Sequence, residues 1–114
     1  MNKKRLVYVI GAYSGDVEGN IKKAEAVSIE LIRAGYHVFT PHKNTAGYEK
    51  YEGSMLNRFN PLPHVISKQT WMDLDLNILS RCDAIFIMES AKDSEGSQIE
   101  IAFAREHDIP EVTL

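Results

Sequence analysis

Residues 6–40 have the sequence LVYVIGAYSGDVEGNIKKAEAVSIELIRAGYHVFT, and this stretch decides the fold. It begins at Leu6 with five apolar residues, mostly β-branched, in a run that is too short for a helix. A continuous apolar run is typical of a strand that is covered on both faces, as in a parallel sheet. Apolar residues then recur at spacings of three and four, which predicts one face of a helix: Ile21, Ala24, Val27, Leu31 and Ala34.

The rest of the chain repeats this alternation. Gly35 ends the first helix as a C′ glycine would, and residues 36–40 predict a second strand that stops at Pro41. A second helix is predicted from the helical spacing of Trp71, Leu74, Ile78 and Leu79, and a third strand follows over 84–88. A third helix is predicted from Ile99, Ala102, Phe103 and Glu106, and a last strand over 110–114. We therefore predict one α/β domain over residues 1–114. Its core is a doubly wound, Rossmann- or flavodoxin-like parallel sheet of four to five strands in a three-layer arrangement.

The stretch over 41–67 interrupts the alternation. It holds two glycines, two further prolines and three aromatic residues, namely Gly47, Gly53, Pro61, Pro63, Tyr48, Tyr51 and Phe59. Connections of this length in compact domains are usually lids, partner-contact segments or disordered. We interpret it as a partly ordered lid or partner-contact loop with one helical turn. His42, Asn44 and Tyr48 are candidates to face a substrate, and the sequence assigns them no role.

Composition limits the classes of function. A net charge of −3 with scattered lysines and arginines gives no reason to expect binding to a nucleic-acid polymer. The single cysteine, Cys82, precedes an apolar run and is predicted to be a buried, inert thiol. The four histidines show no metal-ligand spacing, so we predict neither metal nor cofactor. Without an apolar stretch long enough for a membrane or a signal peptide, we predict a cytoplasmic protein.

Ligands of doubly wound sheets bind outside the carboxyl ends of the strands, so the loops there are the first candidates. The loop from Gly11 to Asp16 has small residues that let backbone N–H groups approach an anion, but it lacks the GxGxxG and P-loop spacings. A structural turn explains this loop equally well. The loop from Glu89 to Ser97 leads into the third helix, and its serines also suit plain helix capping.

Two acidic residues fit a purely structural interpretation less well than these loops do. Glu100 lies in the first turn of the third helix, where the helix dipole favours negative charge. The structural alternative is a capping box, with Ser97 as the N-cap and Glu100 three residues later. Asp75 lies between two leucines of the second helix. The structural alternative is a solvated position on the helix, and Asp73 on the same helix is a competing candidate for a site residue.

Three motifs in this order resemble those of the nucleoside 2-deoxyribosyltransferases and the related 2′-deoxynucleoside 5′-monophosphate N-glycosidases. They are Tyr8-Val9-Ile10-Gly11-Ala12, then Asp75-Leu76-Asn77 with Cys82-Asp83-Ala84, then Ser94-Glu95-Gly96-Ser97-Gln98-Ile99-Glu100. The resemblance implies that Glu100 is the nucleophile at C1′ of the deoxyribose, that Tyr8 positions it and that Asp75 helps to protonate the leaving base. It also implies a set of substrate-binding residues, with Ser94 at a 5′-phosphate: Gly11, Ala12, Tyr13, Ser94, Gly96 and Ser97.

The resemblance further implies a small-molecule nucleoside or nucleotide substrate and a homodimer or larger assembly. Glycosidic cleavage builds positive charge on the sugar and negative charge on the base, so one carboxylate and one acid suit the chemistry. The transferases carry an aspartate near this last loop, where this chain has Asp93 followed by Ser94, and this difference argues against transfer between nucleosides. The sequence does not decide between hydrolysis and transfer. The alternative function is a non-catalytic nucleotide-binding or sensor module that uses the same phosphate loop, in which Glu100 only caps a helix.

Overall fold

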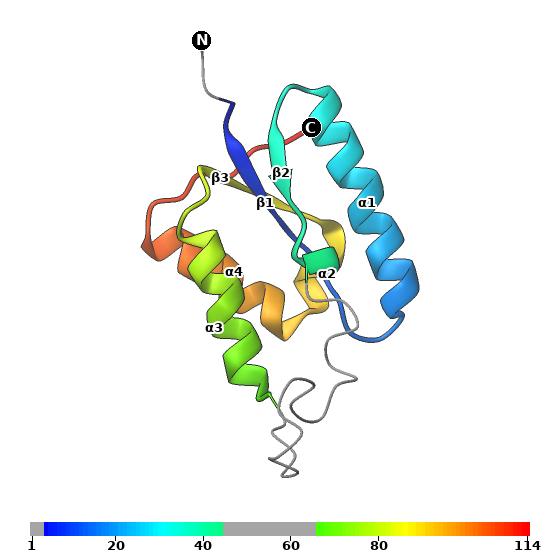
Figure 1. Ribbon diagram of the computed structural model, residues 1–114, viewed down its shortest axis with the longest axis vertical. Helices are drawn as coiled ribbons and strands as arrows, with labels where there is room; N and C mark the ends of the chain where they lie inside the picture. The colour runs from blue at the N-terminus through cyan, green and yellow to red at the C-terminus, as the bar shows by residue number, and fades with distance from the viewer. Residues whose placement is uncertain (1–3, 45–65) are drawn as a thin grey trace, which may run out of the picture.

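The computed structural model describes residues 4–44 and 66–114, and these form a layered α/β domain (Figure 1). Three parallel strands are ordered β2-β1-β3, and they are β1 (Leu6–Ile10), β2 (His37–Phe39) and β3 (Ala84–Ile87). The helices are α1 (Val17–Arg33), α2 (Pro41–Asn44), α3 (Lys68–Leu79) and α4 (Glu95–Glu106), with a 3-10 helix η2 (Glu89–Asp93). The predicted α/β class, parallel pairing and three layers are confirmed.

The central strand β1 divides the core into two halves. Val7 and Val9 point to the face that α1 covers, where they pack in a cluster with Leu31. Tyr8 and Ile10 point to the opposite face, in a cluster that includes residues of α3 and α4. Figure 1 shows α1 on one side of the sheet and α3 with α4 on the other. Burial on both faces explains why β1 is apolar without alternation.

The predicted number of strands differs from the structure, because the sheet has three strands within residues 4–44 and 66–114 rather than four to five. In place of the last predicted strand, Glu111 forms an isolated parallel bridge with Ile85. The Ile85 N–H donates to the Pro110 carbonyl at 2.8 Å, and the Val112 N–H donates to the Ile85 carbonyl at 2.8 Å. Pro110 has no N–H to extend this ladder, so the pairing stays one residue long.

Two helices differ from the predicted pattern. Helix α1 begins at Val17, one turn before Ile21, the first residue of its predicted apolar face, because the Asp16 side chain accepts a hydrogen bond from the Gly19 N–H and caps the helix at residue 16. In α4 the residues at the predicted helical spacing are not the buried ones. Ile99 is 42% exposed, whereas the buried residues of this helix are Ser97, Glu100, Ile101 and Ala104. The C′ role of Gly35 is confirmed by its φ of 102°.

The predicted lid lies mostly outside the described residues. Its first four residues form α2, which supplies the one helical turn expected there. Residues 45–65, with Tyr48, Tyr51 and Phe59, are not among those described, so the lid stays a prediction.

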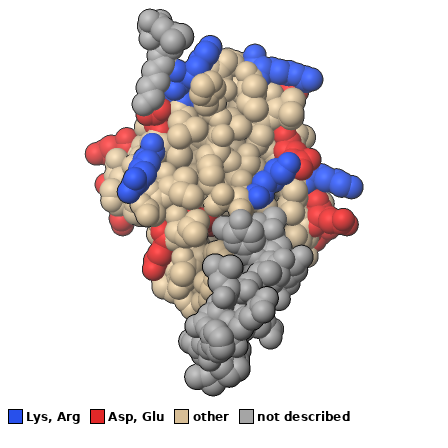
Figure 2. Space-filling model, viewed as in Figure 1, with Lys and Arg blue, Asp and Glu red and all other residues tan. Residues whose placement is uncertain are grey.

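The surface of the described part carries mixed charge. Figure 2 shows lysines and arginines interspersed with acidic residues around the edge of the face in view, with a broad uncharged area between them. None of the described helices is both long enough and apolar enough to cross a membrane.

Candidate active site

The candidate site lies at the carboxyl end of β1, toward the lower part of Figure 1, where α2 and the N-termini of α3 and α4 converge. A cavity of about 400 Å³ is lined by Gly11, Tyr13, Ser14, Pro41, His42, Lys68, Trp71, Asp75 and Glu100. A second hollow of about 590 Å³ shares Ser14, Lys68, Trp71 and Asp75 with it and extends along the start of α4, past Ser94 and Gly96. Both volumes lie in the range of small-molecule sites.

Tyr8 and Glu100 form the buried centre of this site. The Tyr8 hydroxyl donates a hydrogen bond to Oε2 of Glu100, across 92 positions of sequence. Tyr8 is fully buried and Glu100 is 7% exposed, with the glutamate lining the cavity and the tyrosine behind it. The capping-box alternative was wrong, because the Glu100 carboxylate bonds to Tyr8 and the N-cap of α4 is Ser94.

Burial sets the protonation of this pair. The pKa of Glu100 is raised to about 7. Burial is the largest cause, the Tyr8 hydrogen bond lowers this pKa, and the negative charge of Asp75 raises it. Burial and the neighbouring Glu100 carboxylate raise the pKa of Tyr8, so its hydroxyl keeps the proton that it donates. Glu100 therefore changes charge near neutral pH, as groups at functional sites often do.

Asp75 lies on the same cavity wall as Trp71, one helical turn away in α3. Burial raises the pKa of the Asp75 carboxyl to about 6, so it is not a fully solvated helical position. Asp73, the competing candidate, is exposed and accepts a hydrogen bond from the Gln69 side chain at 2.8 Å. Of the two aspartates, Asp75 is the one that lines the cavity.

The loop before α4 places its serines differently. Ser94 lines the second hollow, and its Oγ accepts the Ser97 N–H at 3.2 Å as the N-cap of α4. Gly96 lines the same hollow. The Ser97 side chain is 1% exposed and lines neither cavity, and within the described part of the chain its Oγ has no hydrogen-bond partner. The structure therefore brings Ser94 and Gly96 to the site, but not the hydroxyl of Ser97.

The turn after β1 supplies the wall opposite α3. Gly11 and Tyr13 line the main cavity, and Ala12 lines the second hollow. The Asn20 side chain donates to the carbonyl oxygens of Tyr13 and Ser14 at 3.1 and 3.0 Å. These contacts give the turn a structural role as well as a place at the site.

Four residues that line the main cavity were not predicted from the sequence to belong to the site, namely Ser14, Pro41, Lys68 and Trp71. His42, which was named as a candidate to face a substrate without an assigned role, also lines it. The spacing of Trp71 four residues before Asp75 is the one signal that placed it on the same side of the helix. Among residues 4–44 and 66–114, no three His, Cys, Asp or Glu side chains gather as a metal ion requires.

Comparison with known proteins then places the chain. A family model described as "Domain of unknown function (DUF4406)" matches residues 5–113. The chain belongs to this DUF4406 family. A solved structure of the 2-deoxyribosyltransferase from Bacillus psychrosaccharolyticus matches it with a TM-score of 0.63 and 16% identity, over 93% of this chain and 69% of that one. This DUF4406 chain therefore has the fold of that enzyme, as the sequence resemblance implied. No curated protein matches it.

Proposed function

We propose that this DUF4406 protein cleaves or transfers the N-glycosidic bond of a deoxynucleoside or its 5′-monophosphate. The observation that carries the proposal is the buried Tyr8–Glu100 hydrogen bond at a cavity that Asp75 also lines. The similarity in fold to a 2-deoxyribosyltransferase supports it.

In the proposed reaction Glu100 is the nucleophile. Tyr8 bonds to Oε2, so Oε1 is the oxygen that attacks C1′. A bond forms between Oε1 and C1′ while the bond between C1′ and the base nitrogen breaks, and its electron pair leaves with the base. Asp75 in its acid form gives the base a proton, and burial, which raises the pKa of this carboxyl, favours the acid form.

The ester at Glu100 is resolved in one of two ways. Water attacks C1′ and releases the free sugar, or a nitrogen of a second base attacks C1′ and forms a new nucleoside. In both cases the Glu100 carboxylate is regenerated, and Asp75, now ionised, takes the proton from the attacking group. Ser94 and Gly96 at the start of α4 form the place for a 5′-phosphate, because a helix N-terminus favours an anion.

The direct test is base release. The purified protein is incubated with the four deoxynucleosides, their 5′-monophosphates and the matching ribose compounds, and free base is measured by chromatography. We expect release from at least one deoxy substrate, and exchange when a second free base is added if the protein is a transferase.

The controls come from the same helices. Glu100→Gln is expected to abolish release, whereas Glu106→Gln, at the exposed end of α4, is expected to leave it unchanged. Folded protein that releases no base from any substrate contradicts the proposal. If nucleotides nevertheless raise its melting temperature, the non-catalytic binding module is the better account.

A further inference from the structure

The peptide group between Gly11 and Ala12 is held at both ends. Its carbonyl oxygen, that of Gly11, lies 3.0 Å from Nε2 of His42. Its N–H, that of Ala12, donates to Oγ of Ser90 at 3.0 Å. Because a peptide group is planar, with its C=O and N–H pointing in opposite directions, these two contacts fix its orientation. Ser90 belongs to η2 after β3 and His42 to α2 after β2, so the turn after β1 is tied to both neighbouring strand ends.

The His42 ring is arranged as a donor to this turn. Its Nε2 also lies 3.1 Å from the Ala12 carbonyl, and because both contacts are acceptors, Nε2 must carry the hydrogen. The side chain is 3% exposed, and within the described residues Nδ1 is buried with no hydrogen-bond partner. His42 lines the cavity, with Nε2 engaged by the turn and Nδ1 buried. It therefore acts on the site through the turn.

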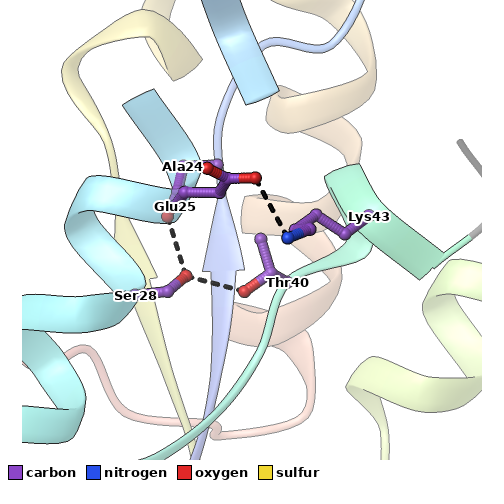
Figure 3. Close-up of polar contacts among 5 residues, drawn as sticks. All are labelled: Ala24, Glu25, Ser28, Thr40 and Lys43. Atoms are coloured by element: carbon purple, nitrogen blue, oxygen red, sulfur yellow. Dashed lines mark hydrogen bonds and ion pairs between the residues drawn. The ribbon is translucent and has the colours of Figure 1, made fainter. Parts of the chain in front are cut away.

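Helix α2 is in turn fixed to α1, as Figure 3 shows. The Ser28 hydroxyl donates to the Ala24 carbonyl at 2.7 Å and lies 2.6 Å from the hydroxyl of Thr40, the residue before α2. In addition, the exposed side chains of Lys43 in α2 and Glu25 in α1 form an ion pair at 3.0 Å. An α-helix of four residues has little stability of its own, so these contacts to the long helix α1 hold His42 in place.

We propose that His42 is a positioning residue that holds the Gly11–Tyr13 wall of the cavity in place for substrate binding. Tyr13 is the next residue along this wall, and its ring lies 6.5 Å from the His42 ring, centroid to centroid. Losing the forked hydrogen bond frees the turn to shift, and Gly11 and Tyr13 shift with it. Glu100 is held separately by Tyr8, so substrate binding is affected and the chemical step is not. The kinetic part of this inference rests on the proposed function.

The test compares two amides at this position. His42→Gln keeps a side-chain N–H close to the place of Nε2, whereas His42→Asn is one bond shorter and cannot reach both carbonyls. We expect His42→Asn to raise the hydrogen-exchange rate of the Ala12 amide and to raise KM by about tenfold, with kcat within about twofold. We expect His42→Gln to restore both values close to wild type. His107→Gln, an exposed histidine at the end of α4, is the control.

The outcomes separate this inference from the proposed function. The role of His42 is overturned if folded His42→Asn leaves the hydrogen-exchange rate of the Ala12 amide unchanged. It is also overturned if His42→Gln changes this rate and KM as much as His42→Asn does. If His42→Asn does not fold, Ser90→Ala removes the opposite anchor and must give the same rise in KM with kcat preserved, and an unchanged KM overturns the inference. A wild-type protein that releases no base overturns the proposed function alone, since the exchange rates still decide whether His42 holds the turn.

Discussion

Tyr8 opposes the effect of burial on the charge of Glu100. Its hydrogen bond stabilises the ionised carboxylate and so lowers the pKa of Glu100, in opposition to burial, which raises it. We expect Tyr8→Phe to raise this pKa further. The acidic limb of the pH–rate profile then moves to higher pH, and kcat/KM at pH 7 falls by roughly tenfold or more, as loss of a hydrogen bond to a charged group predicts. A profile that keeps its wild-type acidic limb contradicts this role.

Asp75 provides a second prediction at the scale of the residue. Asp75→Asn removes the proton donor to the leaving base, so base release is expected to slow by about 100-fold or more. Substrates with poorly leaving bases are expected to lose most, because they depend most on protonation. The matched control is Asp73→Asn, which changes an exposed aspartate of the same helix. Equal losses in the two variants, in stopped assays of base release, refute the assignment of Asp75.

Helix α4 shows how one element serves both fold and site. Ser94 caps the helix and also lines the second hollow, whereas Asp16 caps α1 away from both cavities. Ser94→Ala and Asp16→Ala are each expected to lower the free energy of unfolding by about 1 kcal/mol. Only Ser94→Ala is expected to weaken the binding of 5′-monophosphates relative to nucleosides. Urea unfolding and titration calorimetry measure the two effects, and equal affinities in both variants argue against a phosphate site at Ser94.

The elements also show what the sequence could and could not predict. Strand β1 and the C′ glycine at position 35 were predicted correctly, because a short apolar run and a positive φ are local properties. The burial of Glu100 in α4 does not follow from helical spacing, because Glu100 is a polar residue whose buried partner is Tyr8, 92 positions away. The last strand failed for a related reason, since its pairing depends on contacts with Ile85 and on Pro110, which lacks an N–H.

The site was less predictable from sequence spacing than the helices and strands. Spacing alone left purely structural alternatives open for Glu100 and Asp75, and only the family resemblance grouped them with Tyr8. In the structure Glu100 and Asp75 line one cavity, and Tyr8 is bonded to Glu100 behind it. His42 could not be found in this way, because its role depends on two carbonyl oxygens that the turn after β1 presents to it.

For the whole molecule, the raised pKa of Glu100 predicts how stability depends on pH. The folded protein binds a proton at Glu100 up to about pH 7, whereas the unfolded chain loses it near 4.5. The folded state therefore holds more protons between these values, and the free energy of unfolding falls as pH rises through this range. Asp75, raised from 3.8 to about 6, acts in the same direction.

This dependence is measurable with urea unfolding at pH 5 and pH 8, followed by the fluorescence of Trp71. We expect the wild type to be less stable at pH 8, by an amount on the order of 3 kcal/mol for the Glu100 contribution. Glu100→Gln cannot ionise and is expected to lose most of this difference, whereas Glu106→Gln keeps it. A wild type that is equally stable at both pH values contradicts a buried, ionisable Glu100.

The assembly of the molecule stays a prediction from the resemblance, and sedimentation of the full chain tests it.

The central claim, that Glu100 attacks the sugar, is tested most directly by trapping the covalent intermediate. The protein is incubated with a 2-fluoro-substituted deoxynucleoside or its 5′-monophosphate, which slows breakdown of the ester. The tryptic peptide over 93–105 is then sequenced by mass spectrometry. We predict one added fluorinated glycosyl group, on Glu100 and not on Glu95, and no added mass in Glu100→Gln. Steady turnover with no adduct, or an adduct on another residue, contradicts the account.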